Sequence, residues 1–289
     1  MNTFECLSEE DQEKVLKGLN EDLETKEKDI EHIKNWICQQ PHFILNLSDF
    51  QILRFLRGSK YDLEKTKQKI DSYYSLKSKL PQWFNDRDPE TPRLRELIKL
   101  GDVLQNFDIM CSLTGIGVLI DMKGLTMKHI MQYTPGNLSN VLNVWQNGYT
   151  AENKYWYVFH INNKFQIIYD IGKVFLKKDL RNRVSGGLLI DPRKHQSWVF
   201  FSIAFEDVFD CISEIVKFSM YIGDQIKLFD SNFEKMECEI PKRILPNEYG
   251  GEGGTFSQLA ENCLEYIDSK RDWILEEEKN FIEESKRPK

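Results

Sequence analysis

The sequence lacks a net positive charge, because 46 Asp and Glu residues outweigh 39 Lys and Arg residues and leave a formal charge of −7. No overall basic field is present to attract nucleic acid, so an anionic partner must be met by a local patch. No apolar run approaches the roughly 20 residues of a membrane-spanning helix. The acidic start, MNTFECLSEEDQEKVLKGLNEDLE, has no basic segment followed by an apolar one. We therefore expect no signal peptide and a cytoplasmic location.

Motifs for metal binding, disulfide bonding and catalysis are also missing. The six cysteines are scattered without a CxxC pair, as in a protein with reduced thiols. The five histidines have no metal-ligand spacing, and no GxSxG sequence is present. The GGEGG at 250–254 lacks the lysine and helix start of a phosphate-binding loop, so its glycines are expected to serve a turn. The sequence thus predicts no cofactor and no metal, and an enzyme is the weakest of the functional classes.

The first part of the chain has the apolar spacing of helices. Residues 8–40 are polar, with apolar residues at helical intervals. Ser48 and Asp49 can cap a helix that ends near Gly58, and Tyr61-Asp62 can start another. The Pro- and Asp-rich NDRDPETP at 85–92 is the best domain boundary. These patterns predict a helical N-terminal domain over residues 1–92.

The hydrophobic period changes after this boundary. GIGVLIDMKG (115–124) and KYWYVFHIN (154–162) have the composition of buried strands. A helix that starts at Pro135 follows the first strand, and a basic amphipathic helix at 163–183 follows the second. This alternation predicts a second domain over residues 93–289 with a parallel or mixed sheet covered by helices, hence an α/β fold. A charged helix is expected near the C-terminus, over residues 256–281.

Three separated motifs resemble one known family. LRFLRGSKYDLEKTKQKI is similar to the N-terminal helical signature of the CRAL-TRIO lipid-binding family, GVLIDMKGLTMKHIMQYTP to its central strand and loop, and ILPNEYGGEGGT to its C-terminal signature. Within this family the sequence resembles the alpha-tocopherol-transfer-protein-like branch. The three motifs occur in the family's order and span most of the chain, which makes the signal specific.

The resemblance implies a helical N-terminal domain followed by a mixed sheet whose helices enclose a lipid pocket. Members carry a hydrophobic molecule, such as tocopherol, a retinoid or a similar lipid, from one membrane to another. Residues 163–183 match the family's gate helix, which covers the ligand. The residues expected to line the pocket are apolar, with Met and aromatic side chains prominent. They are Ile120, Met122, Met127, Ile130, Met131, Val141, Trp145, Tyr157, Phe159, Phe165, Ile168 and Phe175. At each single position, plain core packing is the alternative.

The basic face of the gate helix suggests contact with an anionic membrane surface. Family members bind phosphoinositides with basic residues at the end of this helix, and Arg181 and Arg183 match those positions. The expected phosphoinositide-binding residues are Lys154, Lys177, Lys178, Arg181 and Arg183. Asp179 falls where the family has a basic residue, which weakens the match. The alternative is a solvated helix end whose charge complements the helix dipole.

Two departures from the family pattern affect the predicted fold. A strand–helix unit of roughly 30 residues or more is missing between residue 101 and the strand at 115–124. Residues 184–225 form an insertion, after which the family's next strand begins at Ile226. Two origins of this insertion stay open, a translated intron and a genuine family-specific addition.

Two functional classes therefore compete. The first is a monomeric, peripheral membrane carrier of a hydrophobic ligand, with phosphoinositide-assisted release. The alternative is a membrane adaptor that recognises phosphoinositides without transport. A lipid that copurifies with the protein favours the carrier, and headgroup binding with an empty cavity favours the adaptor.

Overall fold

The computed structural model describes residues 13, 16–90, 112, 116–121, 126–131, 134–149, 153–159, 167, 170–175, 225–228, 242 and 246–288. The N-terminal elements are α2 (Lys26–Cys38), β1 (Phe43–Ile44), α3 (Asp49–Gly58), α4 (Leu63–Lys79) and α5 (Pro81–Phe84). The central elements are β2 (Ile116–Asp121), α8 (Met127–Ile130), α9 (Pro135–Asn143), the π-helical η2 (Val144–Gly148), β3 (Asn153–Phe159), the 3₁₀ turn η3 (Lys173–Phe175) and β4 (Gln225–Leu228). The C-terminal elements are η6 (Asn247–Tyr249), α13 (Phe256–Asp268), α14 (Arg271–Glu278), β5 (Phe281–Ile282) and η7 (Glu284–Lys286).

Side-chain caps start the N-terminal helices where the sequence predicts. Ser48 accepts a hydrogen bond from the backbone N–H of Gln51, and Gln51 caps back, which forms a capping box at the start of α3. Asp62 accepts from the backbone N–H of Lys65 and starts α4. The predicted helical run at 8–40 is less continuous, because the chain turns at Asn20 with φ of 58° before α2 begins.

The apolar faces of α2, α3 and α4 form one core. Side chains from all three helices are almost completely buried. The aromatic rings of Phe55, Tyr73 and Phe84 meet edge to face at the centre, with Tyr73 5.7 Å from Phe55 and 6.0 Å from Phe84. The other buried residues in these helices include Ile30, Ile33, Ile37, Ile52, Leu56, Ile70 and Tyr74.

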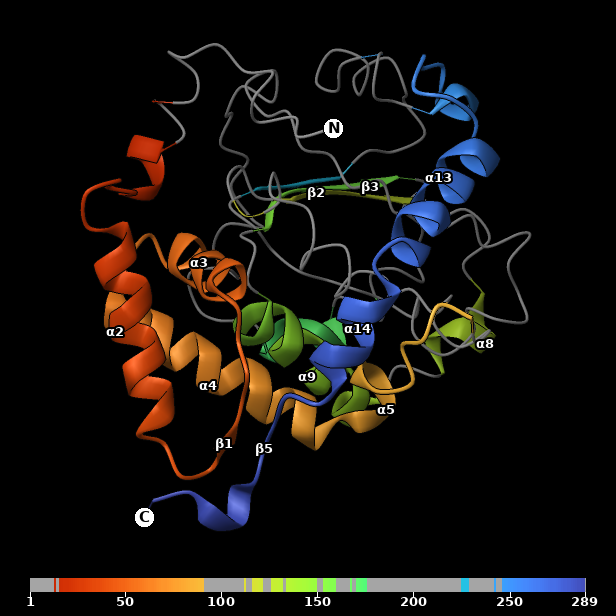
Figure 1. The fold of residues 1–289 in the computed structure, drawn as a ribbon. Helices are drawn as coiled ribbons and strands as arrows, with labels where there is room; N and C mark the ends of the chain where they lie inside the picture. Colours follow the sequence, from red (N-terminus) through yellow and green to blue (C-terminus); the bar gives the residue numbers. More distant parts are fainter. Residues whose placement is uncertain are drawn as a thin grey trace.

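The described sheet is parallel, which is one of the two arrangements, parallel or mixed, that the sequence allows. β2 pairs with β3 and β3 with β4, in the order β2-β3-β4. The connection from β2 to β3 runs through α8, α9 and η2, and Figure 1 places α9 between the sheet and α4. β4 begins at Gln225, the last residue of the proposed insertion and one residue before Ile226, where the family pattern is expected to resume. The remainder of the proposed insertion lies outside the described residues.

The C-terminal segment 271–288, here called the C-terminal strap, packs against the N-terminal helices and not against the sheet (Figure 1). β5 pairs antiparallel with β1, so that Phe43 lies opposite Ile282. The N–H of Glu283 donates to the carbonyl of His42 over 2.8 Å. The segment predicted as a connector takes part as well, since the N–H of Arg87 donates to a carboxylate oxygen of Glu278. Residues at the two ends of the sequence thus build one helical unit.

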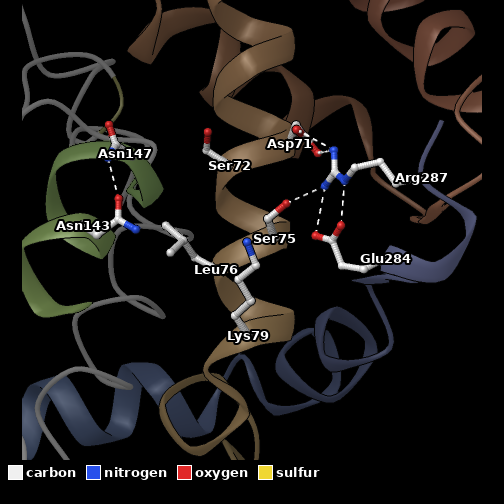
Figure 2. Close-up of a pocket in the computed structure, with 9 residues that line it drawn as sticks. All are labelled: Asp71, Ser72, Ser75, Leu76, Lys79, Asn143, Asn147, Glu284 and Arg287. Carbon is white, nitrogen blue, oxygen red and sulfur yellow. Dashed lines mark hydrogen bonds and ion pairs between the residues drawn. The ribbon is translucent and has the colours of Figure 1, made fainter. Parts of the chain in front are cut away.

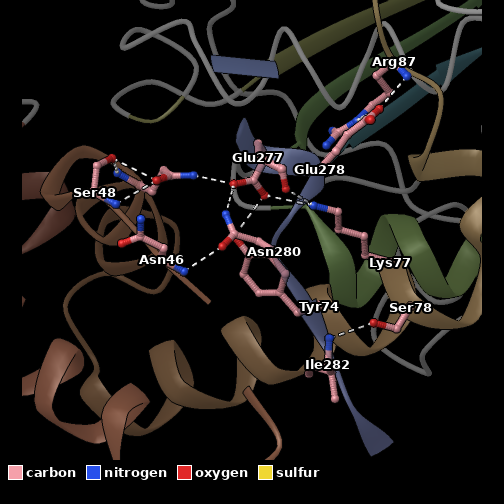
Figure 3. A network of polar contacts seen from close by, with 11 residues as sticks. Asn46, Ser48, Tyr74, Lys77, Ser78, Arg87, Glu277, Glu278, Asn280 and Ile282 are labelled. Carbon is pink, nitrogen blue, oxygen red and sulfur yellow. Dashed lines mark hydrogen bonds and ion pairs between the residues drawn. The ribbon is translucent and has the colours of Figure 1, made fainter. Parts of the chain in front are cut away.

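A buried polar network fixes the strap in place (Figure 3). The carboxylate of Glu277, 3% exposed, accepts hydrogen bonds from four side chains of the helical unit and the strap itself. The donors and distances are Gln51 Nε2 at 2.5 Å, Asn280 Nδ2 at 2.7 Å, Tyr74 Oη at 3.0 Å and Lys77 Nζ at 3.3 Å. Burial, together with the negative charge of Glu277, raises the pKa of Tyr74 well above its ordinary value. Every oxygen of this buried carboxylate is therefore satisfied.

The C-terminal helix differs from the sequence prediction. The expected single helix over 256–281 is two helices, α13 and α14, and Phe281 lies in β5. At the break, the hydroxyl of Ser269 donates to the carbonyl of Tyr266 over 2.6 Å. Such a bond takes an acceptor from the last helical turn and favours its end. The separate α14 then carries Ile274 and Glu277 into the helical unit, where both are buried.

Candidate ligand-binding site

The predicted gate lies against the helix that connects the two strands. Residues 170–172 are helical and continue into η3. A Cβ atom built on Gly172 would lie 3.2 Å from Leu138 Cδ2 and 3.8 Å from Leu142 Cδ1, and both leucines are fully buried on α9. The absence of a side chain at Gly172 therefore lets the gate segment pack closely against the leucine side chains of α9.

A single side chain adds a polar link between the same two segments. The Nε2 group of Gln146 on η2 donates to the carbonyl of Phe175 over 3.3 Å and to the carbonyl of Leu142 over 3.0 Å. It therefore bridges the gate segment to the π-helical turn after α9. This turn is the kind of helical irregularity that recurs at functional sites.

The sheet places several predicted lining residues on adjacent strands. In the parallel register Leu119 is opposite Tyr157, Ile120 is opposite Val158 and Asp121 is opposite Phe159. Val141 lies on α9 and Trp145 on η2, in the connection between these strands. Five of the predicted residues, Ile120, Tyr157, Phe159, Val141 and Trp145, thus belong to neighbouring elements.

The other predicted lining residues divide into two groups. On and after α8, Ile130 is buried, whereas Met127 and Met131 are 48% and 72% exposed. Phe175 is half-buried at the end of η3. Met122, Phe165 and Ile168 lie outside the described residues. The described set therefore includes surface positions as well as buried ones.

One predicted phosphoinositide-binding residue lies in the sheet. The pairing of β3 with β2 shifts between Asn153 and Tyr155, which places Lys154 at the irregularity in the strand. Such bulges redirect a strand locally and are common at functional sites. Lys177, Lys178, Arg181 and Arg183 lie outside the described residues.

Gly172 and Gln146 are the functional candidates that sequence reasoning missed. A glycine within a helical pattern is a usable signal, because it indicates either a break or a close approach. Nothing in the sequence distinguishes Gln146 from an ordinary surface residue.

Two kinds of feature, a membrane-spanning helix and a metal-binding cluster, are absent from the part of the chain that the structure describes. There, no helix has both the length and the apolar character needed to cross a bilayer. The same residues contain no group of three or more His, Cys, Asp or Glu side chains that could hold a metal ion.

Comparison with known proteins identifies the class of protein first. Residues 100–186, which include β2, α9, β3 and η3, match the CRAL/TRIO domain. Residues 22–94 match the family described as Pinta-like, UBA domain. The chain is therefore similar to a CRAL/TRIO domain preceded by a Pinta-like domain, which confirms the resemblance found in the sequence.

Individual relatives make the similarity more specific. The chain is 22% identical to the alpha-tocopherol transfer protein-like proteins of Homo sapiens and Pongo abelii, over 95% of its length and 77% of theirs. It is 21% identical to the protein of the same name from Mus musculus, over the same shares.

Proposed function

We propose that this protein binds one small hydrophobic molecule and carries it between membranes, as a transfer protein and not as an enzyme. The match to the CRAL/TRIO domain supports this proposal, as do relatives whose names describe tocopherol transfer. A tocopherol, a retinoid or a lipid of similar size is the expected ligand.

The observation that carries the proposal is the contact of Gly172 with Leu138 and Leu142. A carrier needs a segment that covers the ligand and can move away without unfolding the protein. The described part of the gate meets α9 and η2 through a glycine and a hydrogen bond from Gln146. One such bond stabilises a structure by only about 1 kcal/mol. We expect a contact of this kind to hold the gate over the ligand and to break without unfolding the protein.

Release at an anionic membrane is the second part of the proposal. The gate sequence continues into Lys177, Lys178, Arg181 and Arg183, and Lys154 is a further basic candidate. Each basic residue near an anionic surface contributes about 1 kcal/mol. Because the whole chain has a charge of −7, this attraction must come from the local patch. Phosphoinositides at a cytoplasmic membrane surface would then favour the open gate.

The test is titration of the purified protein with fluorescent tocopherol, retinoid and sterol analogues, followed by transfer between donor and acceptor vesicles. We expect saturable binding of one analogue at one per chain, and transfer that is faster with protein than without. A folded protein that binds none of them contradicts the carrier. If that protein still binds phosphoinositide vesicles, the adaptor is the better description.

A further inference from the structure

A pocket lies away from the sheet, where three distant parts of the chain meet. It has a volume of about 450 Å³ and is bounded by α4, by the junction of α9 and η2, and by the end of the C-terminal strap (Figure 2). Pockets of this size hold small molecules. Its lining consists of Asp71, Ser72, Ser75, Leu76, Lys79, Asn143, Asn147, Glu284 and Arg287.

The lining is unsuited to a lipid chain. Of the nine lining residues, Leu76 alone has an apolar side chain, and the others present hydroxyl, amide or charged groups. Burying a methylene chain against such groups would remove their hydration without replacing it. The pocket is therefore distinct in chemistry from the proposed lipid site, and a ligand here must be polar.

One side of the pocket is acidic despite containing an arginine. Arg287 NH1 donates to Asp71 over 2.9 Å, while its Nε and NH2 donate to Glu284 over 2.6 and 3.1 Å. Two carboxylates on one guanidinium leave a formal charge of −1. Beyond them, Nε2 of the buried His42 lies 3.6 Å from Asp71. Arg287 is thus fully engaged, and this side favours a cation.

The middle and the opposite side of the pocket offer donors. Figure 2 shows Ser72, Ser75 and Lys79 along α4, with Asn143 across from them. Among the described residues, neither the ammonium of Lys79 nor the hydroxyl of Ser72 has a hydrogen-bond partner, although the charge of Lys79, after the hydrogen bond from Arg287, helps to lower the pKa of Glu284. Ser75 accepts from Arg287 over 2.8 Å and its hydroxyl interacts with Glu284, so it is already engaged and is not counted among the donors for a ligand. Asn143 uses its oxygen to accept from Asn147 over 2.6 Å, which leaves its NH₂ group for a ligand.

We propose that this pocket binds a small zwitterion, with a phosphate at Lys79, Ser72 and Asn143 and an ammonium group beside Asp71 and Glu284. The charges of the two sides cancel, so a ligand with both charges matches them better than either ion alone. Phosphoethanolamine has this chemistry, either free or as the headgroup of a phospholipid.

Binding here acts on the fold as well. The site is complete only when the strap lies on α4, because Glu284 and Arg287 belong to the strap. A ligand that binds this assembled form and not the detached form stabilises it by mass action. The zwitterion therefore fastens the strap to the helical unit and to the connection between β2 and β3.

Calorimetric titration of the full chain with O-phosphoethanolamine, inorganic phosphate and ethanolamine tests the proposal. We expect saturable binding of O-phosphoethanolamine, weaker binding of phosphate and none of ethanolamine. Lys79→Met keeps the length of the side chain and removes its charge, which should weaken binding by at least about tenfold, the effect of one charge-assisted hydrogen bond. Lys28→Met, an exposed position on α2 outside the pocket, is the matched control and should bind as the parent does.

Flotation with phosphatidylethanolamine vesicles separates the two sources of the ligand. If the parent and Lys28→Met float with the vesicles and Lys79→Met does not, the ligand is a lipid headgroup. If the parent binds free O-phosphoethanolamine but does not float, the ligand is a soluble zwitterion. The proposal is overturned if no saturable binding of O-phosphoethanolamine occurs, or if Lys79→Met, folded by circular dichroism, binds it unchanged.

Discussion

Lys77 Nζ lies 3.3 Å from a carboxylate oxygen of Glu277, although 200 residues separate the two in the chain. Each side chain is 2% exposed. An ion pair so deeply buried gives strong destabilisation when one partner is removed, because the other charge stays in the interior. The relationship therefore makes the helical unit dependent on the strap.

Glu277→Ala should lower the free energy of unfolding by about 3–5 kcal/mol, because it leaves Lys77 without its buried counter-charge. Urea unfolding followed by circular dichroism measures this loss. Glu276→Ala is the matched control, since Glu276 is exposed and pairs only locally with Lys279; its effect should stay within about 0.5 kcal/mol. Equal losses in the two variants would mean that the buried network does not hold the strap.

A chain that ends at residue 270 should lose the native packing of α3 and α4. The truncation removes β5, the Glu277 carboxylate and Arg287, and it exposes the buried faces that they cover. Hydrogen exchange should show faster exchange in α4 than in the full chain. A synthetic peptide covering 271–289 should restore protection when added. Unchanged exchange in the truncated chain would show that the helices are stable without the strap.

The ion pair of Asp88 with Arg271 predicts a pH-dependent part of the stability. The guanidinium donates to both oxygens of Asp88, over 2.8 and 2.9 Å, and lowers the pKa of this carboxyl from 3.8 to about 2. A lowered pKa in the folded state gives a contribution that is complete above the unfolded value and is lost as the pH falls. The stability difference between the parent and Asp88→Asn should be constant above about pH 5, shrink as the pH falls, and vanish only below the folded pKa of about 2.

Urea midpoints of both proteins between pH 7 and pH 2 measure this difference. Arg271→Met removes the other partner of the ion pair. This variant should therefore lack the same contribution to the free energy of unfolding, over the same pH window. If the gap between the parent and Asp88→Asn does not change with pH, the ion pair contributes nothing to folding.

Gly172→Leu should loosen the proposed gate. Its side chain would collide with Leu138 and Leu142, which are buried and have little room to move. Displacement of the gate segment should speed the exchange of a bound fluorescent lipid between protein and vesicles. Gly172→Ala is a milder control, because its methyl group requires Leu138 to shift by only a few tenths of an ångström. If neither variant exchanges the bound lipid faster than the parent, the gate lies elsewhere.

Arg181→Glu combined with Arg183→Glu should weaken binding to phosphoinositide vesicles by at least about tenfold, at about 1 kcal/mol for each basic residue lost. Binding of a soluble ligand analogue should hardly change. Vesicle flotation at several salt concentrations measures the effect, which should shrink as salt screens the charges. Intact vesicle binding with loss of ligand binding would make these arginines structural supports of the gate.

Local patterns in the sequence predicted much of the helical unit. The caps at Ser48 and Asp62 and the apolar faces of α3 and α4 follow from spacing and short polar side chains, which depend on near neighbours alone. The two buried strands follow from composition, and alternation with helices restricted their sheet to a parallel or mixed one. These features are confirmed in the described part of the fold.

Glu277 shows why the rest could not be predicted. It lies within the run LEEEKN, where three glutamates in succession look like a solvated face. Its burial depends on Lys77, Tyr74 and Gln51, which are about 200 residues away, and no local pattern encodes such a meeting. The candidate ligand site was only partly predictable for the same reason: its apolar residues could be named, but Gln146 is recognised only from its hydrogen bond to Phe175.

The pairing of β1 with β5 sets an order of events during synthesis. β1 leaves the ribosome long before its partner at Phe281–Ile282, because most of the described elements lie between them in the sequence. Throughout the intervening translation, Lys77 and Tyr74 face no Glu277, and their surroundings stay open to chaperones or to other nascent chains. Long sequence separation of this kind also slows folding after release. α3 and α4 therefore reach their final packing only after the strap, far along the chain, has been made.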